Sequence, residues 1–259
     1  MERMPQHLDT QVVSYAMKGR WDRPLRGSVI SSIVANELLL VQSENPTQAR
    51  FYVPVLSARR TAGLAEFRRR DHPFGRRVSD SIVMDFGNEW PSIVEYNNLA
   101  IANVINQGLC DLWMAAINHL DKPTKRLLAA RFRFLIENGV TCLPLRPDDV
   151  QGAFHLLREF TREHNIKRRF RNTWNDLLVL SSARNAHAHL VTEDSELSRF
   201  ASELCSSVAT LTAGDFVEIP FPQADPRPRR ASRESRGYVN TGWRVQFMRA
   251  QRVGPDAAM

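Results

Sequence analysis

Four acidic residues lie beside apolar segments of the sequence and could bind one metal centre together. Asp9 and Glu37 lie in apolar surroundings, Asp176 comes directly before Leu177 to Leu180, and Asp194 follows an apolar segment that ends at Thr192. Carboxylates that converge repel one another unless a cation lies among them. Ligands that are all oxygen atoms favour hard ions such as Mg²⁺ or Mn²⁺. These residue types therefore predict a divalent-cation site, provided that the fold brings them together.

A capping role is the alternative for two of these acids. Asp194 comes directly before a predicted helix and could cap it, and Asp176 could lie in the first turn of its own helix. No such role is expected for Asp9 or Glu37. Both interpretations stay open for Asp176 and Asp194.

A segment rich in cations and aromatic residues comes directly before Asp176. It runs from Asn165 to Trp174 and contains four cations. Phosphate contacts and base stacking beside a metal would hold a nucleic-acid strand for cutting. The alternative is a solvated loop with buried Phe170 and Trp174. The candidate substrate-binding residues are Thr10, Lys167, Arg168, Arg169, Arg171, Asn175 and Thr192.

Alternating strands and helices are expected to position these side chains. Such alternation is typical of a parallel sheet, and the carboxyl ends of its strands are where an open sheet gathers ligands. We therefore predict an α/β fold, a three-layer αβα sandwich around a central parallel sheet. The first expected strand ends near Asp9, and the other three span 28–33, 140–145 and 189–192. The expected helices span 12–17, 35–40, 147–164 and 173–187.

The middle of the chain differs from this pattern. Residues 57–79 hold seven arginines against two acids, which could form an RNA-facing surface or a solvated face. Ser92 and Glu95 have the spacing of a capping box, which predicts a helix from Ile93 to His119. A second helix is expected from Asp121 to Asn138. We predict that residues from about 90 to 138 pack outside the α/β core as a surface for a partner or for self-association.

Four segments, taken in order, resemble the motifs of PIN-domain nucleases. Leu8-Asp-Thr-Gln-Val-Val resembles the opening strand and helix, and Ile30 to Leu39, with Glu37, resembles the second motif. Asn175-Asp-Leu-Leu resembles the third motif, and Leu190-Val-Thr-Glu-Asp194 the fourth. Gln11 stands where the family often has Asn. The step of 139 residues from Glu37 to Asp176 is longer than a compact domain of this family needs.

The resemblance implies a discontinuous PIN-like domain. It would comprise residues 1–45 and 139–220, with a basic loop and helical insertion at 46–138 and a basic C-terminal tail at 221–259. A short strand is expected at Phe216 to Ile219, and one ordered stretch of the basic tail within Tyr238 to Phe247.

The resemblance also implies an Mg²⁺- or Mn²⁺-dependent endoribonuclease that leaves a 5′-phosphate and a 3′-hydroxyl. Asp9, Asp176 and Asp194 would bind the metal, and Glu37 would bind it or orient the attacking water. Many relatives are toxins or phage-defence proteins, so cellular or phage RNA, including tRNA, is the expected substrate. An antitoxin or other partner protein and a homo-oligomer are expected partners. The alternative is a PIN-like scaffold that binds RNA or a partner protein without cutting.

Composition sets the remaining expectations. The 259 residues carry a formal net charge of +7, and only four of the 35 cations are lysines. Arginine suits phosphate and stacks on bases. No signal peptide or membrane span is expected, so a cytoplasmic location is predicted. The cysteines, which are predicted to be reduced core thiols, are Cys110, Cys142 and Cys205.

Overall fold

The computed structural model describes residues 5–40, 81–86, 93–167, 169–205, 210–211, 217–219 and 243–246. Its strands are β1 (Gln6–Leu8), β2 (Val29–Ser31), β3 (Ser81–Asp85), β4 (Ile93–Asn97), β5 (Thr141–Leu143), β6 (His189–Thr192), β7 (Thr210–Leu211), β8 (Val217–Ile219) and β9 (Trp243–Gln246). Its helices are α1 (Thr10–Met17), α2 (Ser32–Leu39), α4 (Asn98–Asn106), α5 (Cys110–Ala116), α6 (Lys122–Glu137), α7 (Pro147–Glu163), α8 (Phe170–Asn185) and α9 (Ser195–Cys205).

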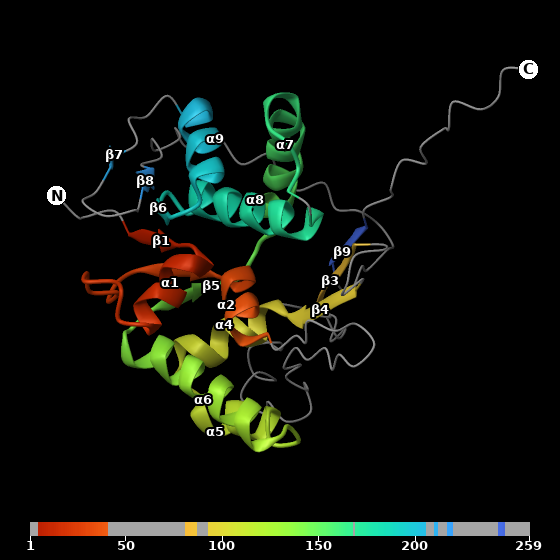
Figure 1. Cartoon of the computed structure of the whole chain (residues 1–259). Helices are drawn as coiled ribbons and strands as arrows, with labels where there is room; N and C mark the ends of the chain where they lie inside the picture. Colours follow the sequence, from red (N-terminus) through yellow and green to blue (C-terminus); the bar gives the residue numbers. More distant parts are fainter. Residues whose placement is uncertain are drawn as a thin grey trace, which may run out of the picture.

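A six-stranded sheet in the order β5-β2-β1-β6-β8-β7 forms the centre of the fold. Its first four strands are parallel, and β8 pairs antiparallel with β6. Helices α7, α8 and α9 lie on one side of the parallel strands, and α1, α2, α4 and α6 lie on the other (Figure 1). The predicted α/β class with a parallel sheet is therefore confirmed, and the arrangement is compatible with three layers.

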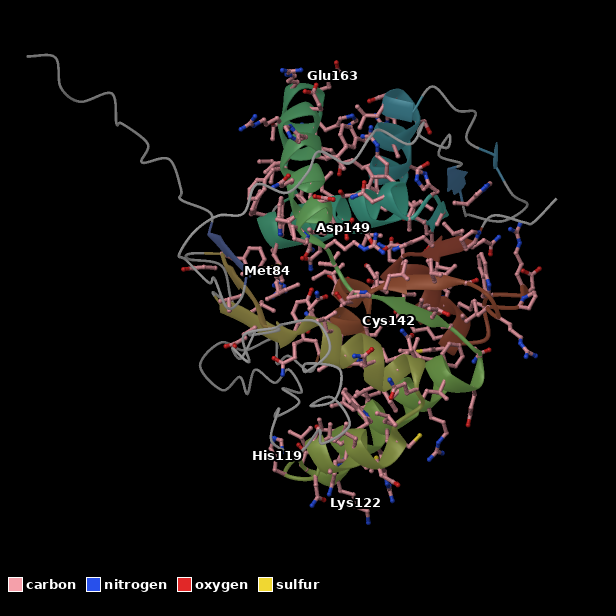
Figure 2. All side chains as sticks on the ribbon, turned by 180° about the vertical axis from the view of Figure 1, so that it is seen from behind. Met84, His119, Lys122, Cys142, Asp149 and Glu163 are labelled. Atoms are coloured by element: carbon pink, nitrogen blue, oxygen red, sulfur yellow. The ribbon has the colours of Figure 1, made fainter. Side chains whose placement is uncertain are left out.

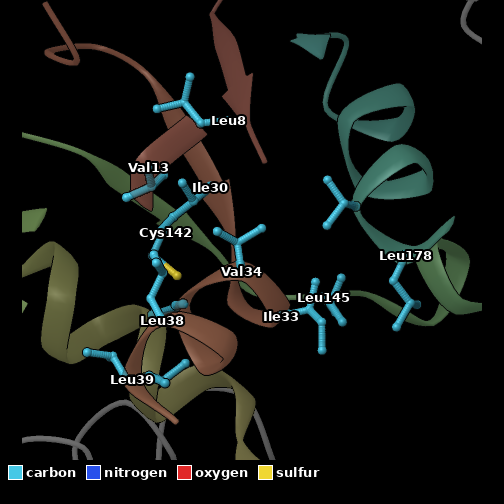
Figure 3. Close-up of a cluster of buried hydrophobic side chains, with 14 of the residues drawn as sticks. Leu8, Val13, Ile30, Ile33, Val34, Leu38, Leu39, Cys142, Leu145 and Leu178 are labelled. Carbon is cyan, nitrogen blue, oxygen red and sulfur yellow. The ribbon is translucent and has the colours of Figure 1, made fainter. Parts of the chain in front are cut away.

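The hydrophobic core joins the sheet to both sets of helices. Its side chains include Leu8 and Ile30 from the strands and Leu178 from α8 (Figure 3). Helix α2 is buried around most of its circumference, because seven of its eight residues are buried. A helix that is apolar on nearly all sides must be covered on nearly all sides. The core therefore fixes the direction in which α2 presents Glu37.

Two asparagines of α4 satisfy backbone groups at the open edge of β5. Asn106 Nδ2 donates to Cys142 O at 2.9 Å, and Cys142 N donates to Asn106 Oδ1 at 2.7 Å. Asn98 makes the same two contacts with the backbone of Leu145, at 2.8 and 2.9 Å. An unpaired strand edge would otherwise leave buried donors and acceptors without partners. Helix α4 is thus packed directly on the central sheet, and the boundary of the proposed insertion stays a prediction.

The predicted helix between Ile93 and His119 is wrong in its first turn. Ile93–Asn97 is strand β4, which pairs antiparallel with β3, and β9 lies parallel to β3 on the other side. Val94 and Tyr96 are buried while Glu95 is exposed, which is the two-residue period of a strand. Because the spacing of Ser92 and Glu95 imitates a capping box, it concealed this alternation. The rest of the predicted helix is divided into α4 and α5.

Most of the other expected elements are present. The helices predicted after Asp121, Pro147 and Thr173 are α6, α7 and α8, and the predicted strands near residues 142, 190 and 218 are β5, β6 and β8. The ordered stretch predicted within 238–247 contains strand β9. The basic segment 57–79 and most of the tail lie outside the described residues. Among the described helices, none has the length and apolar character needed to cross a membrane.

The prediction of core thiols holds for one cysteine and fails for another. Cys142 is a free thiol buried in β5 (Figure 2), whereas Cys110 is free but exposed at the start of α5. Leu109 and Leu112, which flank Cys110, pack against the core instead. The side chain of Cys205 lies outside the described residues.

Candidate metal centre

The carboxyl ends of β1 and β6 form a switch point in the sheet. From β1 the chain passes to β2 and then β5 on one side, and it later returns to β6 on the other side of β1. Helices that follow adjacent strands in opposite directions leave a crevice at such a point. Asp9 follows β1 and Asp194 comes two residues after β6. The topology therefore brings residues 185 positions apart to one edge of the sheet.

Asp9 is the most buried of the four acids, with 4% of its surface exposed. Thr192 donates its hydroxyl to Asp9 Oδ2 at 2.8 Å, and the backbone N–H of Thr10 donates to Oδ1 at 2.6 Å. Asp9 is also the N-cap residue of α1, so the expectation that it has no capping role was wrong. Oδ1 of Asp9 thus accepts from the start of α1, and Oδ2 accepts from Thr192 at the end of β6.

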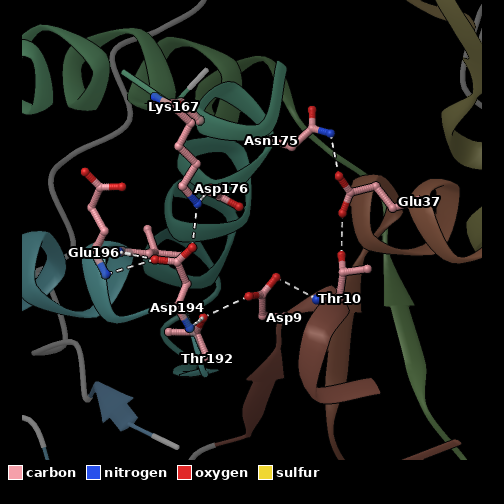
Figure 4. Close-up of polar contacts among 11 residues, drawn as sticks. Asp9, Thr10, Glu37, Lys167, Asn175, Asp176, Thr192, Asp194 and Glu196 are labelled. Atoms are coloured by element: carbon pink, nitrogen blue, oxygen red, sulfur yellow. Dashed lines mark hydrogen bonds and ion pairs between the residues drawn. The ribbon is translucent and has the colours of Figure 1, made fainter. Parts of the chain in front are cut away.

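Glu37 reaches the same space from α2. The Thr10 hydroxyl donates to Glu37 Oε2, and Asn175 Nδ2 donates to Oε1 at 2.6 Å. The donors come from α1 and α8, on either side of Glu37 (Figure 4). Because both oxygens are held, the carboxylate has a fixed orientation toward the other acids.

Asp176 and Asp194 share one cation, the ammonium of Lys167. Its Nζ lies 2.6 Å from Asp176 Oδ2 and 2.5 Å from Asp194 Oδ2. The other oxygen of Asp194 accepts the backbone N–H groups of Glu196 and Leu197, each at 2.9 Å. Asp194 therefore caps α9, as the alternative interpretation held, and it contributes its second oxygen to the cluster at the same time.

The pKa values of two of the acids, Asp9 and Asp176, reflect the charges of their acidic neighbours. The pKa of Asp9 is raised to about 6, first by burial and then by the charges of Glu37 and Asp194, against the hydrogen bonds from Thr192 and the Thr10 backbone. Burial also raises the pKa of Asp176 well above its ordinary value, with Asp9 and Glu37 adding to the effect and Lys167 opposing it. The charges of Glu37 and Asp194 thus act on Asp9, and those of Asp9 and Glu37 act on Asp176, across the same edge of the sheet.

Asp194 differs from its neighbours because its hydrogen bonds outweigh its burial. Burial acts to raise its pKa, but the ammonium of Lys167 and the N–H groups of Leu197 and Glu196 leave the pKa below its ordinary value. Burial likewise acts to lower the pKa of Lys167, and the charge of Asp176 reverses this and raises it. The cluster thus contains one ionised pair and two carboxylates whose negative charge is disfavoured.

The donor set fits a hard divalent cation in chemistry. All four acids offer oxygen atoms, and a cation would relieve the repulsion that raises the pKa of Asp9 and Asp176. The amide oxygen of Asn175 is also buried without a hydrogen-bond partner among the described residues. As placed, however, no three His, Cys, Asp or Glu side chains of the described residues have the spacing of a metal site. Lys167 supplies the positive charge between Asp176 and Asp194.

The residues expected to bind substrate divide into three groups. Thr10, Asn175 and Thr192 lie in the site and donate to the carboxylates. Lys167 is turned inward to the acids. Arg169 is exposed and Arg171 is half-buried at the start of α8. Arg168 lies outside the described residues.

Sequence reasoning missed the role of Lys167 as a bridge between two acids. The signal for it was weak, because Lys167 belongs to a run of cations that all appear equally suited to phosphate. It is the one lysine among these cations, and its compact ammonium can approach two carboxylates at once, whereas guanidinium groups prefer a single carboxylate in a bidentate contact.

Comparisons with known proteins place the chain in no family. No family model matches it, and neither the curated proteins nor the solved structures include a significant match.

Proposed function

We propose that the chain is a metal-dependent endoribonuclease of the PIN type, with Mg²⁺ or Mn²⁺ held by Asp9, Glu37, Asp176 and Asp194. The observation that supports it best is the convergence of these acids from four segments at the switch point of a parallel sheet. Their order along the chain, and the threonines beside them, resemble the PIN motifs. A toxin or defence role on cellular or phage RNA, including tRNA, is the corresponding biological proposal.

The protein's own residues hold the acids ready for this chemistry. Thr192 fixes Asp9 on the strand side, and Thr10 with Asn175 fixes Glu37 on the helix side. A bound divalent ion supplies charge to stabilise the scissile phosphate and lowers the pKa of a water molecule. Glu37 would bind the ion or orient such a water, because Thr10 and Asn175 hold its carboxylate in one orientation.

Lys167 is the second positive charge of the proposed site. It stabilises the ionised forms of Asp176 and Asp194, which burial opposes. Its side chain is 26% exposed, so a phosphate that enters the site could contact it. A metal ion would compete with the ammonium for one of the acids, and a phosphate would compete with the acids for the ammonium. Either would replace one of the two contacts that Lys167 makes with Asp176 and Asp194.

Cleavage of total RNA tests the proposal. The purified protein is incubated with RNA and Mn²⁺, with a chelated sample in parallel and with D176N purified in the same way. The proposal expects fragments that carry a 5′-phosphate and a 3′-hydroxyl, no fragments with chelator, and none with D176N. Equal cleavage by D176N, or cleavage that persists in chelator, would contradict the proposal and indicate another nuclease in the sample.

A catalytically silent RNA- or protein-binding scaffold is the second candidate, and Lys167 is the observation that favours it. Because its ammonium already bridges Asp176 and Asp194, the cluster is partly neutralised without metal. A Mn²⁺ titration followed by electron paramagnetic resonance distinguishes the two candidates. The scaffold would leave the free-ion signal unchanged, whereas the nuclease would reduce it at a stoichiometry of one or two ions per chain.

A further inference from the structure

A groove of about 500 Å³ opens beside the acidic cluster, and none of the motifs indicated it. Thr10 and Glu37, which belong to the cluster, also line the groove, and α1, α2 and α6 form its walls. Its volume falls within the roughly 300–1,000 Å³ range of pockets that hold small organic ligands. A ligand in this groove would contact Glu37, a carboxylate of the proposed metal site, and Thr10, which donates a hydrogen bond to it.

One part of the groove wall is apolar and open to solvent. It includes Met17, Leu127 and Phe134. Leu127 is 45% exposed, although the adjoining face of the same helix supplies Leu128, Phe132 and Leu135 to the core. An exposed apolar wall beside a polar site is suited to a flat, apolar group such as a nucleobase.

The other part of the wall is cationic. Lys18 ends α1, and Arg131 projects from α6. Arg131 Nη1 donates to Leu38 O at 2.7 Å, which anchors the guanidinium at the C-terminal end of α2 and leaves its other N–H groups available to the groove. Two cations next to an apolar surface fit the phosphate and the base of one nucleotide.

The surroundings of the groove also favour a polyanion. Helix α6 carries five cations and one acid, and the segment from Lys18 to Arg26 carries four cations and one acid. Clustered cations attract nucleic acid and release its counterions on binding. A protein ligand with acidic and apolar side chains would meet the same chemistry, but the groove leads to carboxylates placed for phosphodiester cleavage, which favours RNA.

We infer that this groove binds one unpaired nucleotide of single-stranded RNA, next to the bond to be cut. The base would pack on Leu127 and Phe134, and a backbone phosphate would lie near Lys18 and Arg131. Bases of a duplex are stacked and paired, so only a base turned out of a single strand can enter such a concavity. The inference rests on the proposed function, which it deepens by specifying the form of the substrate.

Binding of labelled RNA to the full-length protein tests the inference without cleavage. Fluorescence anisotropy in chelator compares a 12-nucleotide single strand with a duplex of equal length. Two variants alter the groove, K18E and L127E. Two controls make comparable changes elsewhere, R158E at an exposed site of α7, on the other side of the central sheet (Figure 1), and M114E at an exposed site of α5.

The inference expects the groove variants to weaken single-strand binding about tenfold, on the order expected for loss of one phosphate or one base contact. The controls should change affinity less than about threefold, and K18E should also reduce the salt dependence. Equal effects of groove and control variants, tighter binding of the duplex, or no binding of RNA by the parent protein would overturn the inference.

A photo-crosslink separates this result from a failure to fold. RNA with one 4-thiouridine is crosslinked to the unmodified protein, and the attached peptide is identified by mass spectrometry. Attachment within 14–18 or 127–134 supports the groove, and attachment only within 165–174 refutes it. Because neither assay needs catalysis, loss of the groove and absence of nuclease activity are separate outcomes.

Discussion

Replacing Asp9 by asparagine should stabilise the protein while it removes a ligand of the proposed metal site. In the folded state the pKa of Asp9 is raised from 3.8 to about 6, first by burial and then by the charges of Glu37 and Asp194. A carboxyl with a raised pKa favours folding when it is protonated and opposes folding when it is ionised. At pH 7 Asp9 is mostly ionised, so D9N removes an unfavourable charge from the folded state.

The size of this effect follows from the shift and from the hydrogen bonds. A rise from 3.8 to about 6 corresponds to about 3 kcal/mol at pH 7, at about 1.36 kcal/mol for each pKa unit. Asparagine cannot accept hydrogen bonds at both positions, as Asp9 does from Thr10 and Thr192, which costs about 1 kcal/mol. The expected net gain is therefore about 2 kcal/mol at pH 7, falling below about 1 kcal/mol at pH 5 as Asp9 becomes protonated in the parent protein.

Urea denaturation in chelator at pH 7 and pH 5 measures the gain. The comparison of D9N with the parent at each pH isolates Asp9 from the other titrating groups. D149N is a matched control, because Asp149 is a buried capping carboxylate that accepts from Arg146 N and Asn185. D149N should lose about 1 kcal/mol. The reasoning is refuted if D9N is less stable than the parent at pH 7, or if its gain is larger at pH 5.

Three further predictions concern charge in and near the site. K167M should lower the free energy of unfolding by about 3 kcal/mol in chelator, because it leaves Asp176 and Asp194 without their cation. Mn²⁺ should raise the thermal stability of K167M more than that of the parent, and an equal rise in both would contradict a shared cation site. H7L should be about 2 kcal/mol more stable than the parent at pH 5, because burial lowers the pKa of His7 from 6.5 to about 3 and the parent loses stability as the pH falls below 6.5. Urea denaturation should show this gain shrink as the pH rises toward 7, and a gain independent of pH would indicate a packing effect alone. R171A should weaken RNA binding with a smaller salt dependence and leave Mn²⁺ affinity unchanged, whereas a change in Mn²⁺ affinity alone would place Arg171 in the metal site.

The parallel sheet could be predicted because its strands and helices are local in sequence. Short apolar strands next to amphipathic or buried helices, such as β2 with α2, carry their own periodicity. The second sheet was missed because neither β3 nor β4 was predicted as a strand, so the stretch that contains β9 had no strand to pair with. Strand β4 was mistaken for a helix because side-chain spacing near Ser92 satisfied a local rule, whereas tertiary pairing determined the structure.

The candidate site shows the same division between local and long-range information. Family-like motifs located Asp9, Glu37, Asp176 and Asp194, and the structure brings them to one edge of the sheet. The contacts that tune them come from three-dimensional packing. No spacing relates Lys167 to Asp194, or places α6 beside Glu37 to form the groove.

The most direct test of a single acidic centre is single-turnover cleavage of RNA in Mn²⁺ by matched variants. D9N, E37Q, D176N and D194N are compared with D149N, whose carboxylate lies at the start of α7 outside the cluster. Folding of each variant is checked by circular dichroism before the rates are measured. The account predicts that each of the four variants loses at least about a hundredfold in rate while D149N cleaves as the parent does. Retention of the parent rate by folded D9N or D176N would contradict it.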